Sequence, residues 1–298
     1  MIQSSLIKTI SNTSIALIAF AANSVLCRLA LDNEAIDAAS FTAIRLFSGT
    51  IVLFIIIVIS KRIKQPIIQN KKEPSSKGSW LGSILLFTYA ITFSYAYILL
   101  DTGTGALILF GAVQITIVIL SFISGTRLKP MEWLGMAIAF IGFIYLILPS
   151  ITTPSATGFV LMAISGIAWG MYTLQGHSSK NPLTDTAFNF LRTIPLIIII
   201  IITSLNTLTY TSEGIILALL SGGVASGIGY TIWYMALRDL SSLQAAVLQL
   251  LVPILSAFAG VIFISEIITA HFIISSIMVL GGILLVILSN YNKNKVEC

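Results

Sequence analysis

The feature that most limits how this chain folds is a succession of apolar runs, each roughly 20 residues long, separated by short polar turns. A helix of that length crosses the hydrocarbon core of a bilayer and satisfies its own backbone hydrogen bonds. Only 9% of the 298 residues are charged, whereas soluble domains carry roughly 25%. The sequence therefore predicts an all-α polytopic membrane protein.

The apolar runs define ten predicted spans. They lie at 12–31, 38–60, 80–100, 104–124, 131–149, 157–175, 184–204, 214–237, 241–264 and 269–290. The turns between them contain polar or helix-breaking residues, such as Asp101, Pro130 and Pro182. The longest connection, 61–79, is polar and basic, and we expect it to be a mobile loop. No cleavable signal pattern precedes the first run, so we expect that run to be retained as a span.

Lysine and arginine predict the orientation of these spans. Arg28, Arg45 and Arg192 lie inside predicted spans, and every other Lys and Arg falls in the N-terminal tail, the C-terminal tail or alternate loops on one side. The loops of the opposite side carry acidic residues instead, such as Asp101 and Glu266. We therefore expect both termini to be cytoplasmic, in a bacterial inner membrane.

The spans are predicted to form two repeats of five, 1–150 and 151–298. An aromatic helix, a tight turn and a second apolar helix occur at 91–114 and again at 227–253. Arg45 in the second span matches Arg192 in the seventh. Because five is odd, the second repeat enters the bilayer from the other side. Inverted repeats of this kind form carriers whose substrate site lies between the halves near the midplane.

The chain resembles the drug/metabolite transporter superfamily and, within it, the EamA-type ten-helix transporters. The resemblance rests on the two five-span repeats, the Trp169-Gly170 pair, the arginine early in the second span of each repeat, and Pro253 in the ninth span. It covers essentially the whole chain. The first repeat departs from the family pattern, with Phe20-Ala21 where Trp-Gly is common and Gln114 where proline is common. The resemblance implies small-molecule transport, and it is the sole reason to expect export.

Candidate substrate-binding residues are polar or aromatic side chains that fall deep inside predicted spans, where polar groups are costly and tend to be functional, together with one mid-span proline that suits a wall of the cavity. They are Asn23, Tyr89, Phe93, Phe110, Gln114, Trp169, Tyr172, Tyr230, Gln249 and Pro253. The spacing of four between Phe110 and Gln114, and between Gln249 and Pro253, places each pair on one helix face and predicts that both glutamines face the same interior. The alternative for the glutamines is a structural hydrogen bond between helices. The alternative for Pro253, which suits a bend that moves in gating, is a static kink.

Aromatic and basic residues near helix ends admit a structural interpretation. Trp233, Tyr234 and Tyr97 are expected in the aromatic belts at the membrane interface. Arg45 and Arg192 lie roughly 10–12 Å inside their spans, within reach of the interface, so a snorkelled or carbonyl-bonded structural role is expected ahead of a gate or anion site. Arg28 precedes Asp32 by four residues, which predicts a surface ion pair.

No hydrolase triad, carboxylate pair or metal-ligand cluster occurs, so the sequence predicts no enzyme, no cofactor and no bound metal. The basic residues are explained by orientation and do not predict nucleic acid binding. The expected partners are a small-molecule substrate, amino-acid-like or amphipathic, and the lipid bilayer, with monomer and homodimer both open. Absence of a mid-span acid favours facilitated transport or exchange over simple proton antiport. A flippase of lipid-linked substrates and a non-transporting scaffold are the alternative functions.

Overall fold

The structure is a computed structural model, and it describes residues 2–32, 34–64, 77–123, 125, 129–147, 156–240, 242–265, 267, 270, 273–279, 281–282, 284–285 and 289. The predicted mobile loop 61–79 lies outside these residues except at its two ends. So do Arg127 and Glu266, and Asp32 is described only in its backbone.

The described chain is helical throughout, apart from short turns and one isolated antiparallel bridge between Ile36 and Tyr210. The helices are α1 (Ile2–Asp32), α2 (Ala38–Lys64), α3 (Trp80–Tyr97), α4 (Thr102–Ile123), α5 (Pro130–Ile147), α6 (Ala156–His177), α7 (Pro182–Leu191), α8 (Ile194–Ser204), α9 (Ser212–Leu220), the π-helix η2 (Ser221–Ile228), α10 (Gly229–Leu237), α11 (Ser242–Gln249) and α12 (Leu251–Ile264). Each of the first nine predicted spans contains one or more of these helices. The tenth, 269–290, is described only in part, with helix at 273–279.

Prolines break two of the predicted spans into shorter helices. Pro195 lies in the first turn of α8 and has no N–H to donate to the carbonyl of Leu191, where α7 ends. Pro253 likewise cannot donate to the carbonyl of Gln249, and α11 ends at that residue. Both interruptions therefore follow from proline chemistry and lie where the sequence places the proline.

The composition of the helices makes this a multi-pass membrane protein. Five helical segments among the described residues are long and apolar enough to cross a bilayer: Ile7–Leu31, Ala38–Arg62, Ala156–His177, Pro182–Ser204 and Ser212–Leu237. Shorter apolar helices accompany them. Large apolar side chains such as Ile55, Ile199 and Phe258 are half exposed on the outside of the bundle, whereas Arg45 and Asn23 are buried inside it. Apolar surfaces face the lipid, and polar groups face one another.

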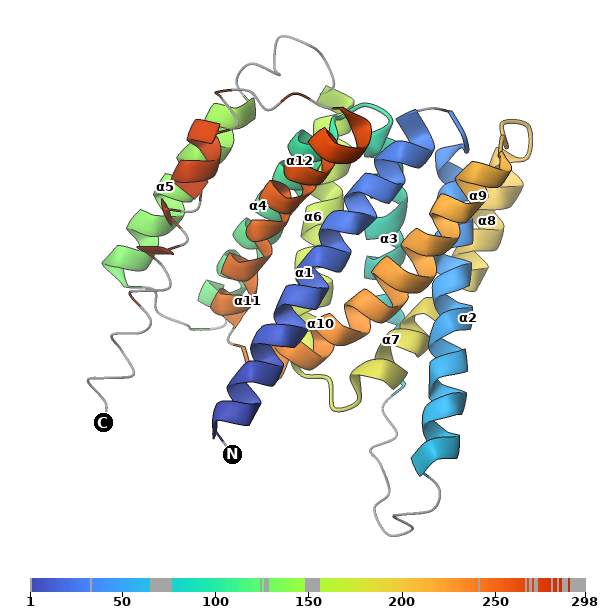
Figure 1. Cartoon of the computed structure of the whole chain (residues 1–298), viewed down its shortest axis with the longest axis horizontal. Helices are drawn as coiled ribbons and strands as arrows, with labels where there is room; N and C mark the ends of the chain where they lie inside the picture. The colour runs from blue at the N-terminus through green and yellow to red at the C-terminus, as the bar shows by residue number, and fades with distance from the viewer. Residues whose placement is uncertain are drawn as a thin grey trace.

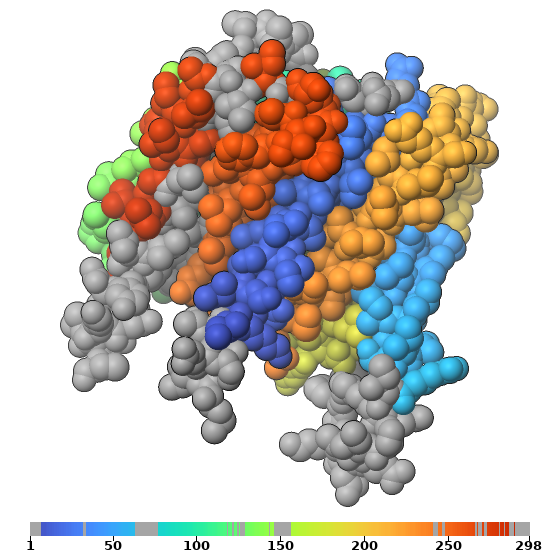
Figure 2. Space-filling view, viewed as in Figure 1, coloured from blue at the N-terminus to red at the C-terminus, as the bar shows by residue number. Residues whose placement is uncertain are grey.

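Helix α1 is in contact with elements of both halves of the chain. It packs against α2, α3 and α4, and also against α9, η2, α10 and α12. Figure 2 shows α1 in dark blue between α12 on one side and η2 with α10 on the other. Helix α5 lies at one edge of the bundle, between α4 and the described part of the last predicted span, where Gly142 packs against Met278 (Figure 1). The interior of the molecule is therefore built around α1, and its side chains meet those of α2, α3 and α10.

Candidate functional site

Polar side chains from several helices meet inside the bundle around the guanidinium of Arg45 on α2. Its Nη2 donates to the hydroxyls of Tyr89 at 3.0 Å and Tyr230 at 2.6 Å, and its Nε donates to Ser226 Oγ at 3.0 Å. Asn23 on α1 donates from Nδ2 to the same two hydroxyls, at 3.2 and 3.4 Å. These residues, Asn23, Arg45, Tyr89, Ser226 and Tyr230, are the central cluster, and they join α1, α2, α3, η2 and α10.

The central cluster is buried, with Arg45 only 1% exposed. The snorkelled interpretation of Arg45 is therefore wrong. A snorkelling arginine extends its charge to the interface, whereas this guanidinium points into the bundle and donates to Tyr89, Tyr230 and Ser226. Its Nη1 has no hydrogen-bond partner within the described part of the chain. A buried cation that lacks part of its hydrogen bonding is costly, so its position calls for a functional explanation.

The close approach of α2 and η2 holds Arg45 in this position. An ideal Cβ on Gly222 would lie under 3.0 Å from the carbonyl oxygen of Arg45 and from Ser48 Oγ, so only glycine fits there. Ser226 and Tyr230 follow at spacing four and eight, on the part of η2 and α10 that faces the guanidinium. π-helical turns are rare and are frequent at functional sites. The glycine-rich segment thus brings two of the hydroxyls of the cluster against α2.

Aromatic rings surround the central cluster. The ring of Trp169 lies 4.5 Å from that of Tyr230 and 4.9 Å from that of Tyr89, measured between centroids. Phe20 packs edge-on to Trp169 at 5.3 Å. The guanidinium carbon of Arg45 lies 5.1 Å from the ring of Tyr89 and 5.0 Å from that of Phe93, which are cation–π distances. The site therefore combines one cation, several hydroxyls and a set of aromatic rings. We call the rings of Phe20, Phe93 and Trp169 the aromatic wall.

Gln249 joins the aromatic wall through a hydrogen bond. Trp169 Nε1 donates to Gln249 Oε1 at 2.7 Å, and both side chains are at most 2% exposed. Gln249 Nε2 donates to the carbonyl of Ala245 at 3.3 Å. Gln249 is the last residue of α11, so this bond ties α6 to the point at which Pro253 interrupts the helix.

We expect Gln249→Leu to lower the free energy of unfolding by about 1–3 kcal/mol, because it leaves the buried indole N–H of Trp169 without an acceptor. Trp169→Phe is expected to strand the Gln249 carbonyl in the same way. The double variant removes both partners, and we expect a coupling energy of about 0.6–2 kcal/mol in a double-mutant cycle of detergent unfolding. Trp133→Phe, at a half-exposed indole on α5, is the control and should cost less. Strictly additive single variants would contradict this prediction.

Several predicted residues lie outside the central cluster. Phe110 packs on Phe20 with the ring centroids 6.4 Å apart, behind the aromatic wall. Gln114 lines a groove beside α5, and Leu250, the residue after Gln249, lines the same groove. Arg192 lies at the end of α7, donates to the carbonyl of Lys77, and stays partly exposed. The two arginines matched by the repeat thus have different surroundings.

The expected interface belts do not include the three aromatics predicted for them. Trp233, Tyr234 and Tyr97 are at most 1% exposed. Tyr234 donates to the carbonyl of Tyr172 at 3.1 Å, and its ring lies 5.1 Å from the Tyr172 ring. These rings lie near helix ends but are turned into the bundle, where neighbouring helices cover them. The prediction failed because distance along a helix does not give the direction of a side chain.

A lateral groove of about 380 Å³ runs between α4 and α5. Its lining is almost entirely apolar, with Gln114 as the polar exception, and it also includes Leu250. Ile119, Phe122 and Trp133 at its rim are about half exposed on the outside of the bundle. The groove therefore opens toward the lipid rather than toward the central cluster.

A small polar pocket of about 160 Å³ lies at the N-terminal end of α3. Asp185, Asn189 and Gln175 line it, together with Tyr234. From Tyr234 the rings of Tyr172, Trp169 and Tyr230 follow one another with centroid distances of 5.1, 5.5 and 4.5 Å. A continuous series of aromatic side chains thus connects this pocket with Arg45.

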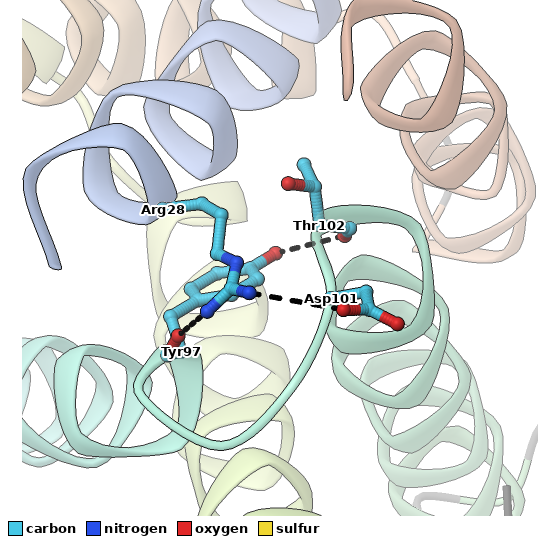
Figure 3. A network of polar contacts seen from close by, with 4 residues as sticks. All are labelled: Arg28, Tyr97, Asp101 and Thr102. Atoms are coloured by element: carbon cyan, nitrogen blue, oxygen red, sulfur yellow. Dashed lines mark hydrogen bonds and ion pairs between the residues drawn. The ribbon is translucent and has the colours of Figure 1, made fainter. Parts of the chain in front are cut away.

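At the opposite end of the bundle, Arg28 joins α1 to the turn between α3 and α4 (Figure 3). Its Nη1 donates to the carbonyl of Tyr97 at 3.0 Å, and its Nη2 lies 3.8 Å from Asp101 Oδ1. Tyr97 in turn donates through its hydroxyl to the carbonyl of Thr102 at 3.3 Å. The expected pairing of Arg28 with Asp32 falls on a side chain outside the described residues. The contacts shown in the figure hold the end of α1 against the turn between α3 and α4.

Sequence reasoning did not single out Phe20, Ser221 and Ser226. Ser221 donates to Asn23 Oδ1, and Ser226 accepts from Arg45. The two serines could have been predicted as site residues, because a hydroxyl inside an apolar span is costly to bury, as other polar groups are. The glycines around them are typical of close helix packing, which accounts for this segment without a functional role. Within the described chain, no group of three metal-ligating side chains is found.

Three comparisons with known proteins bear on this arrangement. The model of the EamA-like transporter family matches residues 8–148 and again 156–288. An uncharacterized protein of Pseudomonas aeruginosa is 42% identical over 280 residues, which cover 94% of each chain. An uncharacterized transporter of Bacillus subtilis is 20% identical over 255 residues, covering 82% of this chain and 85% of that protein. A crystal structure 16% identical to this chain has the same fold, with a TM-score of 0.66 over 94% of this chain and 98% of its own.

Proposed function

The chain belongs to the EamA-like transporter family and is a membrane transporter, and from that premise we propose that it moves small amphipathic metabolites by alternating access around the central cluster. It would act without chemical conversion of the substrate, in a bacterial inner membrane with both termini cytoplasmic, and export is the proposed direction. The observation that carries the proposal is the buried cation Arg45 among hydroxyls and aromatic rings. A charged group inside a membrane helix is costly to bury, and charges that are nevertheless kept there commonly mark substrate pathways.

The packing supports two inverted repeats of five helices. In that arrangement the helices of the second repeat correspond to those of the first as follows: α6 to α1, α7 to α2, η2 and α10 to α3, and α12 to α4. The contact of α1 with α10 then matches that of α6 with α3, and the contact of α1 with α12 matches that of α6 with α4. All four pairs are in contact. The contact of α2 with η2 matches that of α7 with α3 in the same way.

Two junctions at opposite ends of the bundle support the same arrangement (Figure 1). At one end, Asp37 at the start of α2 accepts from the backbone N–H of Thr209, just before α9, at 2.8 Å. At the other end, Asp185 in the first turn of α7 accepts from the backbone N–H of Gly78, just before α3, at 2.8 Å. Each junction joins the second span of one repeat to the third span of the other: α2 to α9 at one end, and α7 to α3 at the other. In the proposed mechanism, these junctions would separate alternately while the central cluster stays between them.

The test of the function is counterflow in proteoliposomes loaded with pooled unlabelled metabolites and supplied with the same compounds labelled. We expect saturable accumulation of at least one compound with wild-type protein, and none with Arg45→Met or with empty liposomes. A wild type that exchanges none of them would overturn the transport proposal. That outcome would instead favour a non-transporting scaffold.

Cys27 offers a test of alternating access. It is buried on α1, next in sequence to Arg28. In detergent-solubilised Cys298→Ser protein we expect Arg28→Gln to raise the rate at which a polar thiol reagent labels Cys27 by at least about threefold, because loss of a charged hydrogen bond favours the state open at that end. Arg192→Gln, near the other end, should not raise it. Equal rates in wild type and Arg28→Gln would contradict a gate at this end.

The lateral groove between α4 and α5 favours a second candidate, a flippase of lipid-linked substrates. An acyl or polyprenyl chain suits an apolar groove that opens toward lipid. A flippase predicts that purified protein is stabilised by polyprenyl phosphate, and that Gly111→Leu in the groove blocks its movement. If counterflow of soluble metabolites survives Gly111→Leu, the carrier is favoured over the flippase.

A further inference from the structure

The central cluster has more hydrogen-bond donors than acceptors. Arg45 contributes five N–H groups and Asn23 two, and Tyr89, Ser226 and Tyr230 contribute one O–H each. The oxygen atoms in reach are the two tyrosine hydroxyls, Ser226 Oγ, and Asn23 Oδ1, which already accepts from Ser221. Arg45 Nη1 has no acceptor within the described part of the chain. A ligand that only accepts hydrogen bonds would complete this arrangement.

The charge of the cluster is also uncompensated. No acidic side chain that the structure describes makes an ion pair with Arg45. The described acids lie near helix ends, and several have other partners. Asp37 caps α2, Asp101 lies beside Arg28, and Asp185 accepts from Gly78. The cation–π contacts with Tyr89 and Phe93 lower the cost of burying the guanidinium but do not neutralise it. One buried positive charge calls for one negative charge on the ligand.

The walls of the site indicate the rest of the ligand. Trp169 and Phe20 pack at 5.3 Å beside the cluster, and Trp169 contacts both tyrosine rings. Such rings bind flat or apolar groups by offset and edge-on stacking. Arg45 Nη2 already donates to both tyrosine hydroxyls, and Tyr230 donates to Tyr89 at 3.1 Å. A carboxylate would therefore accept from Arg45 Nη1, whose N–H groups lack a partner among the described residues, and from the hydroxyl of Tyr89.

We infer that the transported solute is an organic monoanion, with a carboxylate on an aromatic or apolar body and Arg45 as its counter-ion. The inference rests on the proposed transport function and specifies the substrate class of that site. It disfavours a zwitterionic amino acid, because the described cluster offers no acid to pair with an ammonium group. Inorganic anions share the charge but not the body, so they are expected to bind more weakly.

The experiment measures the dissociation constants of four probes for purified wild-type protein: phenylacetate, phenylacetamide, phenylalanine and nitrate. We expect phenylacetate to bind at least about tenfold more tightly than each of the others, in line with hydrogen bonds to a charged group. Arg45→Gln should abolish the preference for phenylacetate over phenylacetamide, and Arg45→Lys should retain part of it. Arg192→Gln, the matched arginine at the surface, should keep it in full. Melting curves check that each variant is folded.

The outcomes separate this inference from the transport proposal. Tight binding and saturable uptake of phenylacetate, lost in Arg45→Gln and kept in Arg192→Gln, would support both. Exchange of pooled metabolites without a preference for the carboxylate would overturn the inference and leave the transporter. Equal or tighter binding of phenylalanine would also overturn it, as would a carboxylate preference that survives Arg45→Gln. Tightest binding of nitrate would overturn the organic anion in favour of an inorganic one. If nothing is exchanged, the transport function falls and the inference falls with it.

Discussion

Replacing Tyr89 and Tyr230 together by phenylalanine is expected to lower the free energy of unfolding by about 3–5 kcal/mol, the range found when a buried charge loses its partners. The two hydroxyls receive the hydrogen bonds of Arg45 Nη2, at 3.0 and 2.6 Å. Without them, Ser226 is the one remaining hydrogen-bond partner of the guanidinium among the described residues. Unfolding in mixed detergent micelles, followed by tryptophan fluorescence, measures the loss.

A rescue variant separates the charge from the shape of the rings. Adding Arg45→Met to the double variant removes the stranded cation, so we expect most of the lost stability to return while transport stays abolished. Tyr95→Phe is the matched control, because Tyr95 is on the same helix as Tyr89 but is 38% exposed on the outer face. It should change the free energy of unfolding by less than about 0.5 kcal/mol. A double variant as stable as Tyr95→Phe would show that Arg45 does not depend on the hydroxyls.

The helical membrane architecture could be predicted from the sequence, because a bilayer limits a chain of this composition to helices of a set length. A bend or kink was predicted at Pro253, close to the end of α11. The separation of α7 from α8 near Pro195 was not predicted, although the same loss of a donor explains it. The π-helix at Ser221–Ile228 was not predicted. Glycines and serines there indicate close packing, but they do not indicate which hydrogen-bond pattern the backbone adopts.

The members of the candidate site could be predicted only in part. Asn23, Tyr89, Trp169, Tyr230 and Gln249 do lie together in the interior. These residues are deep within their spans, and a costly polar or bulky aromatic group at that depth usually turns inward. Depth was therefore a sufficient guide for them.

Arg45 shows why depth alone fails. Its distance from the end of the span allowed snorkelling, but the direction of the side chain is set by η2, more than 170 residues away in the sequence. Arg192 lies at the same repeat position and stays near the surface, because α7 ends one residue before it. Gln114 is one turn and about 40° from Phe110, enough to face the groove instead of the aromatic wall. Tertiary contacts decide these directions.

Gly222→Leu is expected to cause the largest loss of function from a residue that itself touches no substrate. A side chain at Gly222 meets the carbonyl of Arg45 and Ser48 Oγ at under 3.0 Å, and backbone atoms cannot rotate away as a flexible side chain could. Helices α2 and η2 must therefore separate. Overpacking of this kind costs about 1–3 kcal/mol for alanine, and leucine should cost more.

The consequence for transport follows from the position of the clash. The atom that must move is the carbonyl of Arg45, so the guanidinium loses its alignment with Ser226 and Tyr230. We expect even Gly222→Ala to lower both the melting temperature and the uptake rate. Gly281→Ala is the control, because a Cβ there meets no described atom within 4 Å and alanine favours helix by about 0.5–1 kcal/mol. Equal melting temperatures for the two alanine variants would contradict this prediction, because α2 and η2 could then separate at little cost. Gly222 would then not be the residue that holds Arg45 at the centre of the bundle.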